Sequence, residues 1–199
     1  MTRFKLNSWL IAAVLCLSAV ALATDVREHY DGKWWLSLKK EQRLSYVDAY
    51  TVCYQKMVKA EAFDEDIRLY RDRINAYLRE HPQSAQDAVS DLLWRVANPP
   101  YSRPAANHAP GGETYSGRWG LYNGDDYWQL GTDEEHLAFL QGFLDCYEKH
   151  TNHPDGTFSK PREWYVKAID DWYGYGPNVP IVKSHVNDGI PDVLFRFRD

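Results

Sequence analysis

Long hydrophobic runs, basic residues and cysteines are all scarce in this chain of 199 residues. One apolar run, from Trp9 to Leu22, lies near the start, and no later run is long enough to cross a bilayer. Lys and Arg number 23 against 28 Asp and Glu, which gives a formal net charge of −5. This deficit of basic charge argues against binding to nucleic acid or to an anionic membrane surface, because both require a basic face.

The first 23 residues have the pattern of an export signal. Arg3 and Lys5 form a short basic start, the apolar run follows, and Ala21-Leu22-Ala23 matches a small-residue cleavage site. We therefore assign 1–23 to a signal peptide and expect the mature chain, 24–199, in a periplasm or outside the cell. Removal of 1–23 takes away two of the 23 basic residues and no acidic one, so the formal charge becomes −7. A mature chain of about 176 residues suits a single domain.

Only two of the three cysteines, Cys53 and Cys146, remain after removal of the signal peptide. In an oxidising compartment an even pair of cysteines favours a disulfide over two free thiols. We therefore predict a disulfide between Cys53 and Cys146. The alternative is two small buried apolar residues that do not meet.

Recognisable catalytic and metal-binding motifs are also missing. The sequence has no Gly-rich phosphate loop, Gly-x-Ser-x-Gly elbow, His-Glu-x-x-His or complete Cys/His array. His150 and His153, with His185 further along, fall short of a zinc pattern, and we interpret His150 as part of a solvated helix end. Glu41 and Glu134 fit either a pair of glycosidase carboxylates or first-turn acids that oppose the helix dipole. We therefore expect no metal and no cofactor, and we assign no catalytic residue.

The sequence does contain one stretch that occurs twice. Residues 35–56 align without a gap on residues 128–149, and the paired positions are chemically similar, as in Trp35/Trp128, Glu41/Glu134, Tyr46/Phe139, Cys53/Cys146 and Tyr54/Tyr147. Residues 85–96 align in the same way on 186–197, with Asp91/Asp192 among the matched positions. We therefore predict an all-α fold by tandem duplication of a three-helix unit, with six helices around a pseudo-twofold axis. Repeat 1 spans 34–96, the linker 97–126 and repeat 2 127–197.

Hydrophobic periodicity and capping residues place the individual helices. The first helix is expected from Ser37 to about Lys59, after an unpatterned arm, and its wide apolar face predicts a central position. A second helix follows the acidic cap 64–66, with Arg71 and Arg73 facing water, and a third covers 85–96. In the second copy, Thr132 and Glu135 form a capping box, 159–161 opens the next helix, and Gly174 closes it.

The linker is rich in proline and glycine, and it has no helical period. A connection of this length is usually a binding segment or a disordered tether, and flexible tethers seldom contain aromatic residues. We predict that four aromatic side chains of the linker bind a ligand or partner: Tyr101, Tyr115, Trp119 and Tyr122. The alternative is that these rings only pack the linker against the helices.

The stretch Phe139-Leu-Gln-Gly-Phe-Leu-Asp-Cys146 resembles a motif of exported helical immunity proteins of the Rap1a/Tai kind, which bind and neutralise a periplasmic toxin. The resemblance covers one short stretch of each copy and implies a protein that binds or inhibits a partner protein without catalysis. Our first hypothesis is such a module. The second is a cell-envelope protein that binds or cleaves glycans through the aromatic linker. A third is a scaffold for an assembly.

Overall fold

A computed structural model describes residues 30–58, 62–97, 123–150, 158–175, 185 and 188–198. These residues are predominantly helical, which confirms the predicted all-α class. The α-helices are α2 (Gly32–Ser37), α3 (Lys40–Val58), α4 (Ile67–Glu80), α5 (Val89–Ala97), α6 (Asp133–His150), α7 (Arg162–Tyr173) and α8 (Ile190–Arg196). A 3₁₀ helix, η1 (Pro82–Gln86), and a π-helical turn, η3 (Gly124–Trp128), complete the described elements. The predicted signal peptide and the four linker aromatics lie outside the described residues.

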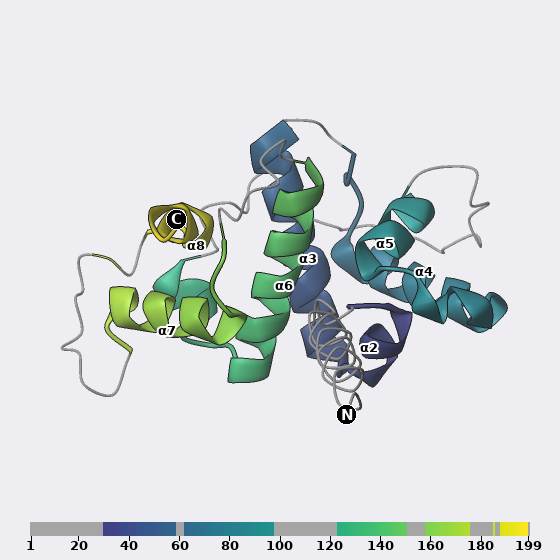
Figure 1. Cartoon of the computed structure of the whole chain (residues 1–199), viewed down its shortest axis with the longest axis horizontal. Helices are drawn as coiled ribbons and strands as arrows, with labels where there is room; N and C mark the ends of the chain where they lie inside the picture. Colours follow the sequence, from purple (N-terminus) through teal and green to yellow (C-terminus); the bar gives the residue numbers. More distant parts are fainter. Residues whose placement is uncertain are drawn as a thin grey trace, which may run out of the picture.

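Helices α3 and α6 lie side by side and run in the same direction through the middle of the molecule (Figure 1). Helices α2, α4 and α5 lie on one side of this pair, and α7 and α8 lie on the other (Figure 1). The Cys53–Cys146 disulfide joins the two helices, with Cα atoms 6.1 Å apart, a separation that a disulfide spans readily. The predicted disulfide and the predicted packing of the two central helices against each other are thus confirmed.

The two central helices approach each other closely at Gly142. A Cβ atom built on Gly142 would lie 2.1 Å from the backbone oxygen of Tyr46 and 2.9 Å from its carbonyl carbon. A side chain cannot relieve this contact, because the opposing atoms are backbone. Glycine therefore permits a helix spacing that any other residue would prevent.

Each half repeats the same contacts between its central helix and its flanking helices. The indole of Trp35 donates to Asn75 Oδ1 at 2.8 Å, and that of Trp128 donates to Asp170 Oδ1 at 2.7 Å. One phenylalanine in each half, the buried Phe63 or the partly buried Phe158, packs against rings from three helices of its own half. These are the contacts expected of two similar units, whereas their origin by tandem duplication and the pseudo-twofold axis stay predictions.

Two reciprocal ion pairs connect the halves. Lys56 near the end of α3 pairs with Asp192 of α8, and Lys149 near the end of α6 pairs with Asp91 of α5. Each pair therefore joins the central helix of one half to the last helix of the other half. Asp91 and Asp192 form these pairs across the halves.

The structure corrects the sequence prediction at the start of the chain. Helix α2 begins at Gly32, inside the segment that we expected to be an unpatterned arm. The Asp31 side chain caps it by accepting hydrogen bonds from the backbone N–H groups of Lys33 and Trp34, both at 3.0 Å. Helix α5 begins only at Val89, because the 3₁₀ helix η1 occupies the residues before it.

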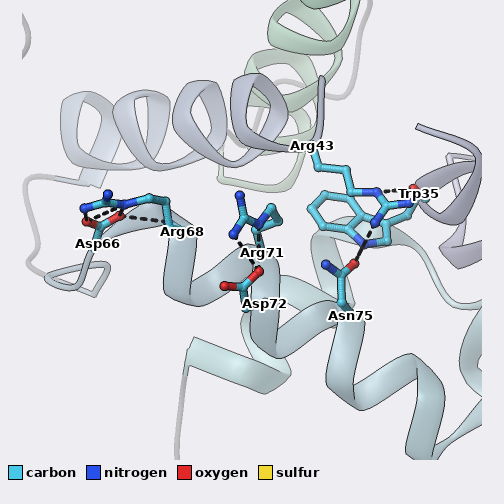
Figure 2. Close-up of polar contacts among 7 residues, drawn as sticks. All are labelled: Trp35, Arg43, Asp66, Arg68, Arg71, Asp72 and Asn75. Atoms are coloured by element: carbon cyan, nitrogen blue, oxygen red, sulfur yellow. Dashed lines mark hydrogen bonds and ion pairs between the residues drawn. The ribbon is translucent and has the colours of Figure 1, made fainter. Parts of the chain in front are cut away.

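The prediction that Arg71 and Arg73 face water is wrong, since both residues are only 9% exposed. Arg73 forms an ion pair with Glu65, and Arg71 pairs with its neighbour Asp72 at 2.7 Å. Figure 2 shows the Arg71–Asp72 pair between the Asp66–Arg68 pair at one end of α4 and the contacts of Arg43. The apolar face of α4 is therefore flanked by buried, paired arginines rather than by solvated ones.

Candidate functional site

A cleft of about 850 Å³ opens between the two halves. One wall comes from α5 and the segments beside it, another from the second half of α6, and a third from the start of α7 and the residues before it. Its lining residues are Tyr30, Ala88, Ser90, Asp91, Gln141, Leu144, Asp145, Glu148, Lys149, Phe158, Lys160, Pro161, Arg162 and Glu163. The cleft is thus built from both halves and exists only when they are packed together.

Helical spacing explains why α6 presents several polar groups to the cleft. Gln141 lies three and four residues before Leu144 and Asp145, and Glu148 lies four and three residues after them, so all four share one face of the helix. The neighbouring face of α6, which carries Gly142 and Cys146, packs on α3. At the edge of the cleft, the guanidinium of Arg162 lies 4.3 Å from the ring centre of Tyr30, a cation–π contact between the halves.

Asp145 is the carboxylic acid of the cleft that is most tightly held. The Tyr46 hydroxyl of α3 donates to its Oδ2 at 2.6 Å, and the Gln141 amide donates to its Oδ1 at 2.5 Å. The Tyr46 ring is fully buried in the core, while Asp145 is partly buried and lines the cleft. A hydrogen bond therefore connects the centre of the α3–α6 interface to the cleft.

The electrostatic environment of Asp145 brings its proton equilibrium close to neutral pH. Burial raises the pKa of the Asp145 carboxyl to about 7, more than the hydrogen bonds from Tyr46 and Gln141 lower it. Glu148 raises this pKa further, whereas the positive charge of Arg162 lowers it. A carboxyl group with this pKa in a cleft can exchange a proton with a ligand under ordinary conditions.

The other half of the protein has no polar counterpart of this pair. In the alignment of the two copies, Tyr46 corresponds to Phe139 and Asp145 corresponds to Val52. Phe139 is fully buried and Val52 is 2% exposed, so apolar side chains fill the equivalent positions. The Tyr46–Asp145 hydrogen bond is therefore a difference between two otherwise similar halves.

Residues that the sequence analysis considered for chemistry lie elsewhere. Glu41 and Glu134 are in the first turns of α3 and α6, and hydrogen bonds, the largest from the backbone, lower the pKa of Glu134. His150 ends α6 as expected, and its half-buried ring packs on Tyr54, with ring centres 4.8 Å apart, and contacts the Tyr50 hydroxyl at 3.1 Å. Within the described ranges, no three His, Cys, Asp or Glu side chains gather as metal ligands would.

Sequence reasoning did not identify the cleft, although one signal was present. Asp145 lies inside the short stretch that resembles immunity proteins, directly before Cys146, where its aligned partner Val52 is apolar. An acid at a position that is apolar in the other copy indicates that the surroundings of this position differ between the two halves. The remaining walls come from distant segments, so their meeting with α6 was not predictable from local pattern.

Comparison of this chain with protein-family models, curated proteins and solved structures finds no match. Its site is therefore interpreted from its own residues. The part of the chain that the structure describes contains no helix long and apolar enough to cross a membrane.

Proposed function

We propose that this chain is an exported, non-catalytic protein that binds or inhibits a partner protein by holding a segment of it in the cleft. The export signal and the disulfide support a place in a periplasm or outside the cell. The resemblance to immunity proteins supports a protein partner. The linker residues Tyr101, Tyr115, Trp119 and Tyr122 stay part of this proposal as an additional contact surface.

The observation on which this proposal depends is the Tyr46–Asp145 pair at the cleft. Two buried apolar residues fill the same positions in the other half, so packing of the helices does not require a polar pair. Burial of the Asp145 carboxyl costs desolvation, and its hydrogen bonds from Tyr46 and Gln141 offset this cost only in part, since its pKa stays raised. The cleft volume lies in the range of pockets that hold a small ligand or a few side chains.

Site-specific photo-crosslinking in the native cell envelope tests the proposal. A photoreactive residue replaces Glu163 at the rim of the cleft, and in a control protein it replaces Arg68, the aligned position of the other half. Both positions are exposed at the start of the equivalent helices α7 and α4. We expect a discrete adduct of one partner from position 163 and none from position 68. Equal labelling at both positions, or none at either, would contradict the proposal.

A second candidate function is cleavage of envelope glycans, and the near-neutral pKa of Asp145 favours it. Glycosidases use one carboxylic acid with a raised pKa as the proton donor and a second carboxylate as base or nucleophile. Glu148, Glu163 and Asp91 also line the cleft. Incubation of the mature protein with purified cell-wall glycan tests this function. Release of reducing ends that disappears in Asp145→Asn supports it, and the absence of release excludes it for that glycan.

A further inference from the structure

The wall of the cleft at Asp145 has the properties of a subsite for one particular kind of group. We infer that it binds a cationic side chain of the partner, the ammonium of a lysine or the guanidinium of an arginine, through the Asp145 carboxylate. This inference rests on the proposed function, because it names the chemistry by which the partner segment is recognised. It assigns a specificity role to Asp145 and a positioning role to Tyr46.

The first argument is the number of acceptor sites that remain on Asp145. Each carboxylate oxygen accepts one hydrogen bond from the protein, Oδ2 from Tyr46 and Oδ1 from Gln141. An ionised carboxylate offers about four lone-pair positions, so two acceptor positions remain for a ligand in the cleft. A group bound to the ionised form must therefore be a hydrogen-bond donor, and an ammonium or guanidinium supplies several donors at once.

The second argument is charge. The ionised form of Asp145 is destabilised by burial, and a cation would restore more of that loss than a neutral donor, because it adds Coulomb attraction to its hydrogen bonds. Two cations of the chain lie nearby: Lys149 pairs with Asp91 of α5, and Arg162 of α7 lies over Tyr30. The charge of Arg162 also acts on Asp145, but burial outweighs its effect on the pKa. Glu148 on the same face of α6 adds negative charge beside Asp145. The subsite therefore favours an incoming positive charge.

The third argument is that the fixed geometry around Asp145 suits a binding role. Tyr46 is rigidly packed in the core, so its hydroxyl holds Oδ2 in one orientation. Gln141, one helical turn before Asp145, holds Oδ1. A carboxylate whose two oxygens are both oriented can receive a cationic side chain with little loss of its own conformational freedom.

Proton release on binding follows from this arrangement. A cation at the subsite stabilises the ionised form, so binding must displace the proton that Asp145 carries below its pKa. With a pKa of about 7, the ionised fraction rises about tenfold between pH 6 and pH 8. The affinity of the full-length mature protein for a cationic group should rise by the same factor.

The experiment uses three capped amino acids that differ in charge but are similar in length: the N-acetyl methylamides of lysine, arginine and norleucine. NMR titration of the mature protein follows the Asp145 carboxyl carbon. We expect the lysine or arginine probe to lower the Asp145 pKa and to bind about tenfold more tightly at pH 8 than at pH 6. Equal binding of the norleucine probe, or affinity for the cationic probes that does not change with pH, would overturn the inference.

Three variants separate recognition from folding. Tyr46→Phe combined with Asp145→Val gives the cleft the apolar pair of the other half, so it should fold while losing binding of the cationic probes. In Asp145→Asn the affinity for the cationic probes should no longer change with pH. Asp192→Asn is the control, because it also removes one carboxylate but from an exposed position on α8, which does not line the cleft. This variant should bind the probes as the unmodified protein does. Retained binding in the double variant would contradict the inference.

The two proposals fail in different ways. A partner adduct at position 163 with no charge preference among the probes would leave the proposed function standing and remove the cationic subsite. Charge-selective probe binding without a partner adduct would leave the subsite and remove the partner. Release of reducing ends from glycan, together with equal binding of all three probes, would favour the glycan function over both.

Discussion

Replacement of Gly142 by alanine should break the packing of the two central helices. In a free helix this change is favourable by about 1 kcal/mol, because alanine has a higher helix propensity than glycine. Here the added Cβ would lie 2.1 Å from the Tyr46 backbone oxygen. The Cβ is fixed to one helix backbone and the oxygen belongs to the other, so the helices themselves must separate by about 1.3 Å to restore an ordinary contact.

The size of the effect follows from the balance of these two terms. Overpacking in a core typically costs about 1–3 kcal/mol. Because rigid backbone cannot move aside as a side chain can, we expect a cost of about 3–4 kcal/mol for this contact. After subtraction of the propensity gain, we expect Gly142→Ala to lower the free energy of unfolding by about 2–3 kcal/mol. For a domain of this size, the melting temperature should fall by roughly 4–12 °C.

Urea denaturation of the oxidised protein, followed by circular dichroism, measures this change. Glu134→Ala is the matched control, because it also places alanine on α6 but on an exposed side chain in its first turn. The control should change the free energy of unfolding by less than about 1 kcal/mol, through the loss of an acid near the helix start. A Gly142→Ala protein as stable as the unmodified one would refute the close approach of α3 and α6.

Three further predictions concern other contacts. Replacing Cys53 and Cys146 together by alanine should lower the free energy of unfolding by about 4 kcal/mol, since the bond closes a loop of more than 90 residues; urea denaturation measures this, and a loss below about 1 kcal/mol would contradict it. The folded pKa of Asp145 lies above its unfolded value of 3.8, so the native state holds the extra proton between pH 4 and 7. The stability that this proton adds is therefore present at low pH and is lost as the pH rises to 7, by roughly 3 kcal/mol. Urea melts of the unmodified protein and of Asp145→Asn at several pH values measure this loss. The same dependence of stability on pH in both proteins would contradict it. Glu65→Ala leaves the buried guanidinium of Arg73 without its carboxylate and should cost about 3 kcal/mol in urea melts, whereas a cost below about 1 kcal/mol would show that water replaces the carboxylate.

The elements that were predictable from sequence are those with a strong local pattern. The capping box of α6 is present as predicted: Glu135 accepts from the Thr132 backbone at 2.7 Å, and the Thr132 hydroxyl accepts from the Glu135 backbone at 3.3 Å. Gly174 ends α7 in the left-handed conformation, with φ of 79°. The wide apolar face of the first long helix correctly indicated a central position, because such a face can be buried only between other helices.

What was not predictable depends on contacts between distant segments. Helix α2 is short, and it is held by the backbone hydrogen bond from Gly32 to the oxygen of Asp87 at 3.1 Å, which no local pattern indicates. The burial of Arg73 depends on Glu65, eight residues earlier and outside the helix. The cleft needs three walls from both halves. The linker aromatics, which the sequence analysis predicted as binding residues, lie outside the described residues.

Where the two copies of the repeat carry different residues, some aligned pairs make the same contact and others do not. Arg43 donates to the backbone oxygen of Trp35 at 2.9 Å, and the aligned His136 makes the same contact with Trp128 at 2.8 Å. The two copies thus differ in residue type at this position, but Arg43 and His136 both hold the backbone of the aligned tryptophan. The Tyr46–Asp145 pair is different in kind, because its counterpart is apolar.

A polar pair in place of an apolar one costs desolvation and needs a compensating interaction. In most of the core the two copies use similar side chains, so the fold does not depend on this difference. The pair lies where the interface of α3 and α6 meets the cleft, and the proposed ligand would add a further interaction there. Divergence at these two aligned positions therefore supports the proposed binding site more directly than any motif in the sequence.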